Sequence, residues 1–191
     1  MIANPMDLYG CWSSCCLPGE KSRVTWKFPV TEVVSYESFE KNLGGILDFL
    51  LESTSAQIGL NTLVMMGENL ECEANQCVRK ANAIIRKLGG KNPIRVTVVD
   101  TFDACETFLL NSTDQEYRSK GLKVEDFASV GPELTIKRMF FGQSYDTVSR
   151  RFGLKILSDA LHLNDTGAKL VSESISLWLR HGLRNHYAHL D

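Results

Sequence analysis

Asp159-Ala-Leu-His162 is the stretch of this sequence best suited to chemistry, because a carboxylate and an imidazole stand three residues apart. At a junction between a loop and a helix, Asp159 can orient the His162 ring and stabilise its charged form, which makes the histidine a general base. A second stretch, Gly67-Glu-Asn69, offers a side-chain amide that can donate to an oxyanion, beside a glycine that relieves crowding. The two stretches together predict parts of a site for acyl transfer.

Alternating strand and helix patterns are expected to position these residues. The period of the apolar residues predicts strands over 24–30, 62–66 and 94–99, and amphipathic helices over 39–50 and 74–88. Residues 103–152 predict one or two short helices and no site. A short strand over 154–157 should lead into the Asp159 and His162 loop, followed by a helix from about Thr166 that Asn164 or Asp165 can cap.

This order predicts one α/β domain with a mostly parallel sheet, since the connections are short enough for right-handed crossovers. The expected divisions are an irregular segment over 1–22, the domain over 23–182 and a tail over 183–191. Both chemical stretches follow a predicted strand. They should therefore meet beyond the carboxyl ends of the strands, where open parallel sheets bind ligands.

These stretches resemble two signature blocks of the SGNH, or GDSL-type, hydrolase superfamily: Gly-X-Asn-Asp after a central strand, and Asp-X-X-His before the last helix. The resemblance implies a three-layer α/β/α, flavodoxin-like fold and an esterase or O-acetyl-ester hydrolase. It also implies His162 as base, Asp159 as its partner, and Asn69 with Gly67 at the oxyanion. Cys16-Leu-Pro-Gly19 and the strand around Trp26 further resemble the PC-esterase-type branch or the esterase domains of some retrotransposons.

The superfamily's nucleophile block, Gly-Asp-Ser, does not occur in this sequence. Ser13 is the serine in a comparable N-terminal place, but too few residues separate it from Val24 for the helix that follows the nucleophile in the superfamily. Leu70 replaces the acidic end of the Gly-X-Asn-Asp block. The glycine of a further block has no counterpart after Val30. The resemblance thus implies a hydrolase fold in which the serine has to come from Ser13 or elsewhere.

Three other interpretations stay open. The first is a non-catalytic descendant that binds a glycan or protein, or the product of a truncated gene that has lost its first strand. Loss of that strand would expose a sheet edge and predict self-association. The second is structural: Asp159 caps a helix, and Gly67 forms a tight turn. The third is a flavodoxin-like binding domain, which would need phosphate-binding glycines where the sequence has Val30-Thr-Glu-Val.

The resemblance implies a small ester or an acetylated glycan as substrate, and composition argues against two other classes of partner. Lys and Arg number 21 against 23 Asp and Glu, and this net charge of -2 does not favour nucleic acid. No apolar run approaches the ~20 residues of a membrane-spanning helix. No cofactor motif and no zinc-type spacing is present, although six cysteines occur (Cys11, Cys15, Cys16, Cys72, Cys77, Cys105).

The compartment stays open. The absence of a signal-like start favours the cytoplasm. The cysteines and the glycosylation triplets at Asn111 and Asn164 favour a secretory lumen.

Overall fold

The computed structural model describes residues 34–123 and 126–187, and the predicted strand over 24–30 lies outside these ranges. In chain order the elements are α2 (Tyr36–Ser53), β1 (Ile58–Asn61), α3 (Glu73–Gly89), β2 (Val96–Val99), α4 (Thr101–Ser112), α5 (Gln115–Lys120), α6 (Phe127–Phe141), α7 (Tyr145–Ser149), the 3-10 helix η2 (Arg150–Phe152) and α8 (Asp165–Tyr187). β1 and β2 pair in parallel, Ile58 opposite Val96, with α3 between them in the chain. The predicted α/β character is confirmed.

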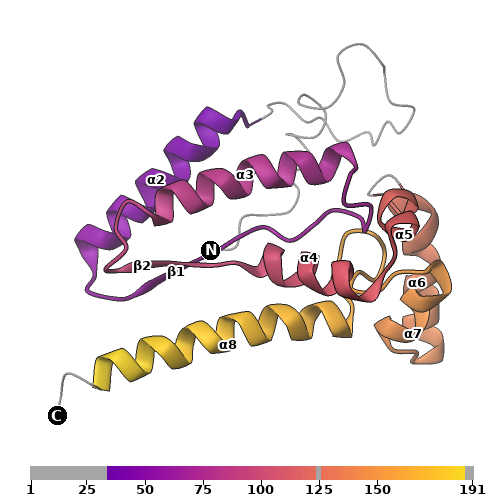
Figure 1. Cartoon of the computed structure of the whole chain (residues 1–191). Helices are drawn as coiled ribbons and strands as arrows, with labels where there is room; N and C mark the ends of the chain where they lie inside the picture. The colour runs from indigo at the N-terminus through magenta and orange to yellow at the C-terminus, as the bar shows by residue number, and fades with distance from the viewer. Residues whose placement is uncertain (1–33, 124–125, 188–191) are drawn as a thin grey trace.

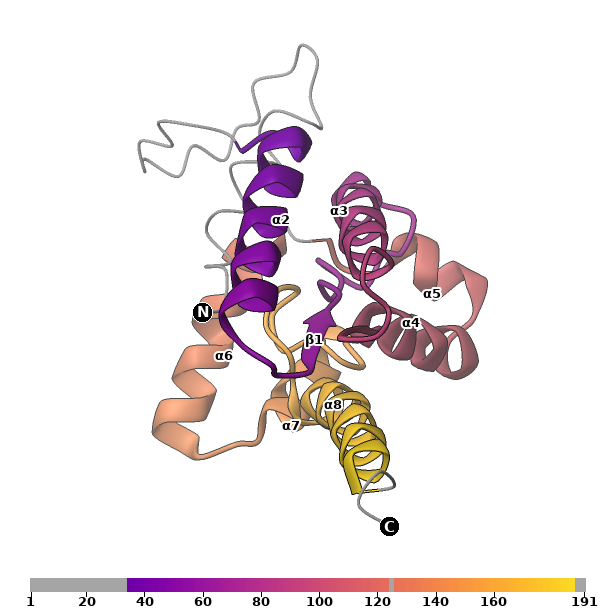
Figure 2. The same ribbon diagram turned by 90° about the vertical axis from the view of Figure 1, so that its left-hand side faces the viewer.

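Helices flank both faces of this small sheet. Figure 1 shows α2 and α3 over one face and α8 over the other, while α4 continues from the end of β2. Figure 2, turned by 90°, shows β1 among these helices. The helices α5, α6 and α7 gather at the end of the molecule toward which the strands run. None of the helices in the described ranges combines the length and apolar character needed to cross a membrane.

The strand predicted over 62–66 is wrong, because β1 ends at Asn61. The run that follows is apolar and buried, with Met65 only 1% exposed. Thr62 N still donates to Val99 O of β2 (3.1 Å), but Leu63 and Met66 bond to side chains of α3 rather than to a neighbouring strand. The Asn82 side chain accepts from Leu63 N (2.7 Å) and donates to Leu63 O (2.9 Å), and Asn75 Oδ1 accepts from Met66 N (2.9 Å). Side-chain amides thus satisfy the groups that a strand partner would otherwise satisfy.

The strand predicted over 154–157 is also wrong. Leu154, Ile156 and Leu157 are buried as a strand would be, but the segment has only one bridge, between Leu157 and Leu163. Its N–H groups bond to the carboxylate of Glu68 instead. Residues 103–152 hold more helix than expected, because α4, α5, α6, α7 and η2 all fall largely in this region.

The three long helices match the predictions closely. The stripe of α3 is buried, and Leu47 of α2 is 3% exposed, although Ile46 in the same predicted stripe is 59% exposed. Asn164 caps α8, because its Oδ1 accepts from Gly167 N (2.9 Å). The helix continues past the expected domain end at 182 as far as Tyr187.

The main core lies where the strands end, beneath the segments that carry the candidate residues. Its buried members come from the extended run after β1, from α3 and α4, and from the loop before α8: Met65, Met66, Leu70, Ala74, Val78, Phe102, Cys105, Leu109, Leu154, Ile156 and Leu157. Each Å² of apolar surface that these side chains remove from water contributes about 25 cal/mol to the stability of the fold. Leu154, Ile156 and Leu157 therefore anchor the loop before α8 in this core.

Candidate functional site

Asp159 and His162 form a hydrogen-bonded pair in the loop before α8. His162 Nδ1 lies 2.8 Å from Asp159 Oδ2. The second oxygen, Asp159 Oδ1, accepts from the backbone N–H of His162 (2.7 Å) and of Leu161 (3.1 Å). The Asp159 side chain is 5% exposed and that of His162 is 62% exposed. A buried carboxylate therefore holds an exposed imidazole from behind.

The two pKa shifts favour a charged carboxylate and a basic ring. The hydrogen bond to Asp159 is the largest effect on His162 and raises its pKa above 6.5, against the opposing effect of burial. Burial is the largest effect on Asp159 and would raise its pKa, but hydrogen bonds from the His162 side chain and backbone outweigh it and the pKa is lowered. An ionised carboxylate only accepts, so Nδ1 carries the ring proton and Nε2 is the basic nitrogen of the neutral ring.

The pair stands at the tip of a tight loop whose two arms are bonded together. Ser158 N donates to His162 O (2.7 Å), and Asn164 N donates to Ile156 O (3.0 Å). Between them Ala160 is fully buried with φ 71, a left-handed conformation that costs a non-glycine residue about 1–2 kcal/mol. Strained backbone of this kind persists where the surroundings over-determine it, as they often do at functional sites.

The Gly67-Glu-Asn69 stretch lies against this loop, as the sequence led us to expect. Gly67 N donates to Ala160 O over 2.7 Å. Gly67 has φ 73, and a Cβ at this position would lie 2.6 Å from Leu122 O, so only glycine fits without a shift. The structure thus brings the two predicted stretches into direct contact through their backbones.

The side chain of Asn69 is hydrogen-bonded to backbone groups on both of its polar atoms. Its side chain is 4% exposed, Nδ2 donates to Ser119 O (2.6 Å), and Oδ1 accepts from Glu71 N (3.1 Å). One of its two amide N–H bonds is therefore committed to Ser119. Leu70, which takes the place of an acidic residue, is part of the core and 7% exposed. The role of Asn69 as oxyanion donor stays a prediction.

The predicted nucleophile Ser13 lies outside the described residues. Ser158, the serine beside the pair, is 1% exposed and its hydroxyl donates to His162 O (3.1 Å). Ser149 is fully buried, and its hydroxyl accepts from the Asn164 amide. Both hydroxyls support the loop rather than face solvent.

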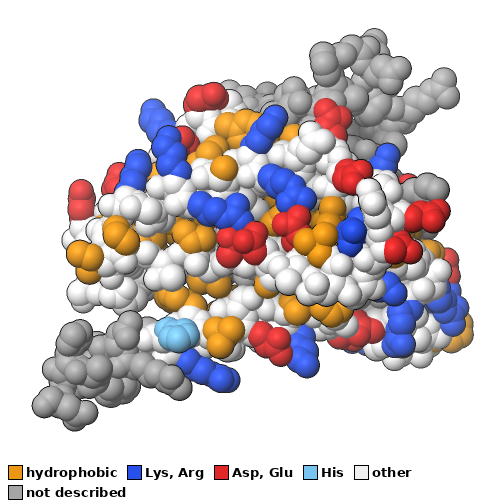
Figure 3. Space-filling view, viewed as in Figure 1, with side chains coloured by type: hydrophobic (Ala, Val, Ile, Leu, Met, Phe, Trp, Pro, Cys, Tyr) orange, Lys and Arg blue, Asp and Glu red, His pale blue; other side chains and the backbone are white. Residues whose placement is uncertain are grey.

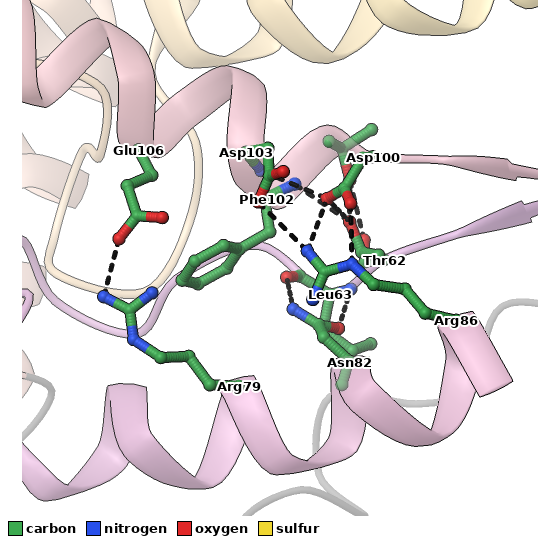
Figure 4. Close-up of polar contacts among 10 residues, drawn as sticks. Thr62, Leu63, Arg79, Asn82, Arg86, Asp100, Phe102, Asp103 and Glu106 are labelled. Carbon is green, nitrogen blue, oxygen red and sulfur yellow. Dashed lines mark hydrogen bonds and ion pairs between the residues drawn. The ribbon is translucent and has the colours of Figure 1, made fainter.

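A second polar cluster joins α3 to the start of α4. Basic and acidic side chains lie next to one another on the face that shows these helices (Figure 3). Figure 4 shows Arg86 reaching Asp100, with Nε 2.7 Å from Oδ2 and a further N–H 3.0 Å from Oδ1. Asp100 Oδ1 also accepts from Thr62 Oγ1 (3.0 Å) at the end of β1. This bidentate pair ties α3 to the ends of both strands.

Charge in this cluster is mutually stabilised. The Asp100 hydrogen bond is the largest effect on Arg86 and raises its pKa. Burial would raise the pKa of Asp100, but the hydrogen bonds from Arg86, Asp103 N and Thr62 outweigh it and the pKa is lowered. In Figure 4, Arg79 contacts Glu106 and its guanidinium lies 4.8 Å from the centre of the Phe102 ring. The cluster is built from matched partners and serves to hold the elements in place.

Sequence reasoning missed the polar residues that shape the candidate site. Glu68 and Asn75 are 0% exposed, and each bonds backbone groups of the Gly67 or Asp159 segments. Asn164 was expected only as a helix cap, but its amide also donates to Lys155 O. A signal for α3 was present: Asn75 and Asn82 fall seven residues apart within its apolar stripe, and a buried amide needs partners. No comparable signal identifies Glu68, whose partners lie far away in the chain.

In the described ranges, no group of three or more His, Cys, Asp or Glu side chains is placed to hold a metal ion. Cys11, Cys15 and Cys16 lie outside them. The glycosylation triplet at Asn164 is inaccessible in this fold, because its amide is 2% exposed and donates to Lys155 O (3.1 Å). Asn111 is exposed on α4.

No family model, curated protein or solved structure matches this chain.

Proposed function

We propose that this chain is an SGNH-like ester hydrolase in which Asp159 and His162 form the acid and base of the site. The observation that carries the proposal is the 2.8 Å contact between His162 Nδ1 and the buried Asp159 carboxylate, at a strained loop bonded to Gly67. Helices on both faces of the parallel sheet support a three-layer, flavodoxin-like arrangement (Figure 1). A small ester or an O-acetyl group on a glycan is the substrate.

The proposed mechanism uses Nε2, the basic nitrogen of the neutral His162 ring. His162 Nε2 takes the proton of a serine hydroxyl while that oxygen attacks the ester carbonyl, and Asp159 stabilises the imidazolium that forms. The alcohol leaves with the proton from His162. Water, deprotonated by the same nitrogen, then attacks the acyl-serine, and His162 returns the proton to the serine oxygen as the acid leaves. Ser13 is the candidate nucleophile, and the remaining Asn69 N–H with the Gly67 turn is the candidate oxyanion site.

Hydrolysis of p-nitrophenyl acetate tests the proposal. The wild type should release p-nitrophenol, and His162→Ala should lower the rate by about 100-fold or more, the usual contribution of a general base. His181→Ala is the matched control, because His181 is an exposed histidine on α8. Equal rates for the wild type and His162→Ala would contradict the proposal.

The second candidate is a non-catalytic domain that retains this fold to bind a glycan or a protein. It is favoured by the burial of Asn69, whose amide donates to Ser119 O. It is also favoured by Leu70, an apolar residue at the place where the superfamily's block has an aspartate. This candidate predicts that wild type and His162→Ala show the same background rate. Binding of acetylated glycans in a glycan array, unchanged by His162→Ala, would then support it.

A further inference from the structure

Glu68 is a fully buried carboxylate whose surroundings consist of main-chain donors. Its Oε1 accepts from three consecutive N–H groups, those of Lys155 (2.9 Å), Ile156 (2.8 Å) and Leu157 (2.8 Å). Its Oε2 accepts from the Tyr117 hydroxyl of α5. Successive N–H groups that converge on one point form a concave site for an anion. Here the anion is a side chain of the same protein.

The segment that Glu68 binds leads directly into the candidate pair. Residues 155–157 are followed by Ser158 and Asp159. The residue before Glu68, Gly67, donates to Ala160 O between Asp159 and His162. Two neighbouring residues therefore hold the loop at two points, one before the pair and one inside it. A shift of Glu68 would move the backbone that carries Asp159.

The loop needs a hydrogen-bond acceptor that reaches it from this position. An apolar side chain would leave the N–H groups of residues 155–157 without this acceptor. Glu68 is 0% exposed, so it cannot itself touch a substrate. Its charge is felt nearby: burial first, and then Glu68, raises the pKa of the Cys105 thiol to about 11.

We propose that Glu68 is a positioning residue for the Asp159 and His162 pair, acting through the three N–H groups of residues 155–157. The inference rests on the proposed function to the extent that the pair is catalytic. The property that matters is reach: the carboxyl oxygen must arrive at the loop N–H groups. Glutamine keeps this reach and loses the charge, whereas aspartate keeps the charge and is one methylene shorter.

The test compares Glu68→Gln and Glu68→Asp by proton NMR of the His162 Nδ1–H, which reports its hydrogen bond to Asp159. Glu68→Gln should keep this resonance, and Glu68→Asp should broaden or lose it. Asn82→Leu is the control for general destabilisation, because it breaks two buried hydrogen bonds to Leu63 away from the loop. It should leave the resonance in place. In an active enzyme, Glu68→Asp should also lower kcat about tenfold or more through misplacement of the base.

The opposite pattern would overturn the proposal. If Glu68→Asp retains the His162 resonance, or Glu68→Gln loses it, reach is not the property that positions the pair. Loss of the resonance in Asn82→Leu would equally contradict it, since any destabilisation would then suffice. The NMR readout does not depend on turnover. A wild type without esterase activity but with the expected resonances would refute the proposed function and leave the role of Glu68 standing.

Discussion

Gly67 donates its backbone N–H to the carbonyl oxygen of Ala160 over 2.7 Å, and this bond joins the two stretches of the chain that carry the candidate chemistry. Neither residue contributes a reactive side chain. The contact matters because Ala160 lies between Asp159 and His162, in a left-handed conformation at φ 71. The loop that presents the base is thus held from the outside by a glycine turn.

Gly67→Ala tests the steric demand of that turn. The Cβ of an alanine here would lie 2.6 Å from Leu122 O, and the alanine backbone would have to adopt φ 73. We therefore expect the free energy of unfolding to fall by about 2 kcal/mol or more. Gly142→Ala is the matched control, because Gly142 has φ 60 but no atom within 4 Å of its Cβ position. It should cost about 1 kcal/mol in urea denaturation. Equal losses of stability in Gly67→Ala and Gly142→Ala would show that the backbone at Leu122 yields to the added Cβ.

Asn82→Leu tests whether a side-chain amide replaces a strand partner. The variant removes the partner of the part-buried N–H and C=O of Leu63, so we expect a loss of about 1 kcal/mol or more for each group. Gln76→Leu changes an exposed residue of the same helix and should stay within about 0.5 kcal/mol of the wild type. Chemical denaturation measures both. A neutral Asn82→Leu would mean that the run after β1 finds other partners.

Acid should weaken the tie between α3 and α4. The folded pKa of Asp100 is lowered below 3.8, so its ion pair with Arg86 stabilises the protein above the pKa of the unfolded state, about 3.9. This contribution is lost as the pH falls through the folded pKa. The stability difference between wild type and Asp100→Asn should therefore be largest at pH 7 and shrink below about pH 4. Asp103→Asn, at a 62% exposed side chain, is the control. A difference that does not change with pH would contradict this assignment.

The pH dependence of turnover should follow His162. Its hydrogen bond to Asp159 raises its pKa above 6.5, so the basic form accumulates, and activity rises, as the pH passes through a value above 6.5. The same shift stabilises the fold fully below pH 6.5, an effect lost as the pH rises through the folded pKa. Asp159→Asn should move the activity profile to lower pH and reduce its plateau about 100-fold or more. An unchanged profile would contradict the claim that Asp159 sets the pKa of His162 during turnover.

The sequence was sufficient where one local pattern determines the structure. The stripe of α3, the β-branched run of β2 and the Asn164 cap of α8 each express a preference within a few residues, and all three were predicted. The Asp159 and His162 pair belongs to the same class, because a three-residue spacing sets its geometry. Gly67 does lie beside the pair, although the strands expected over 62–66 and 154–157, on which that expectation depended, are absent.

Prediction failed where distant polar groups replace regular pairing. Residues 62–66 and 154–157 have the composition of buried strands, yet Asn82 and Glu68 satisfy their N–H groups instead. Apolar composition reports burial and does not report which acceptor the backbone uses. The helices between α4 and α8 were underestimated for a related reason. Of these, α6 has apolar residues such as Phe140 exposed, and it lacks a one-sided stripe.

Covalent labelling with a fluorophosphonate probe tests the central claim most directly, because the probe reacts with a serine only when a neighbouring base activates it. Intact mass should show one adduct on the wild type, and peptide mapping should place it on a serine, with Ser13 as the prediction. Labelling of His162→Ala should be slower by about 100-fold or more, whereas His181→Ala should label like the wild type. No adduct on the wild type, or equal labelling of wild type and His162→Ala, would contradict a catalytic pair at Asp159 and His162.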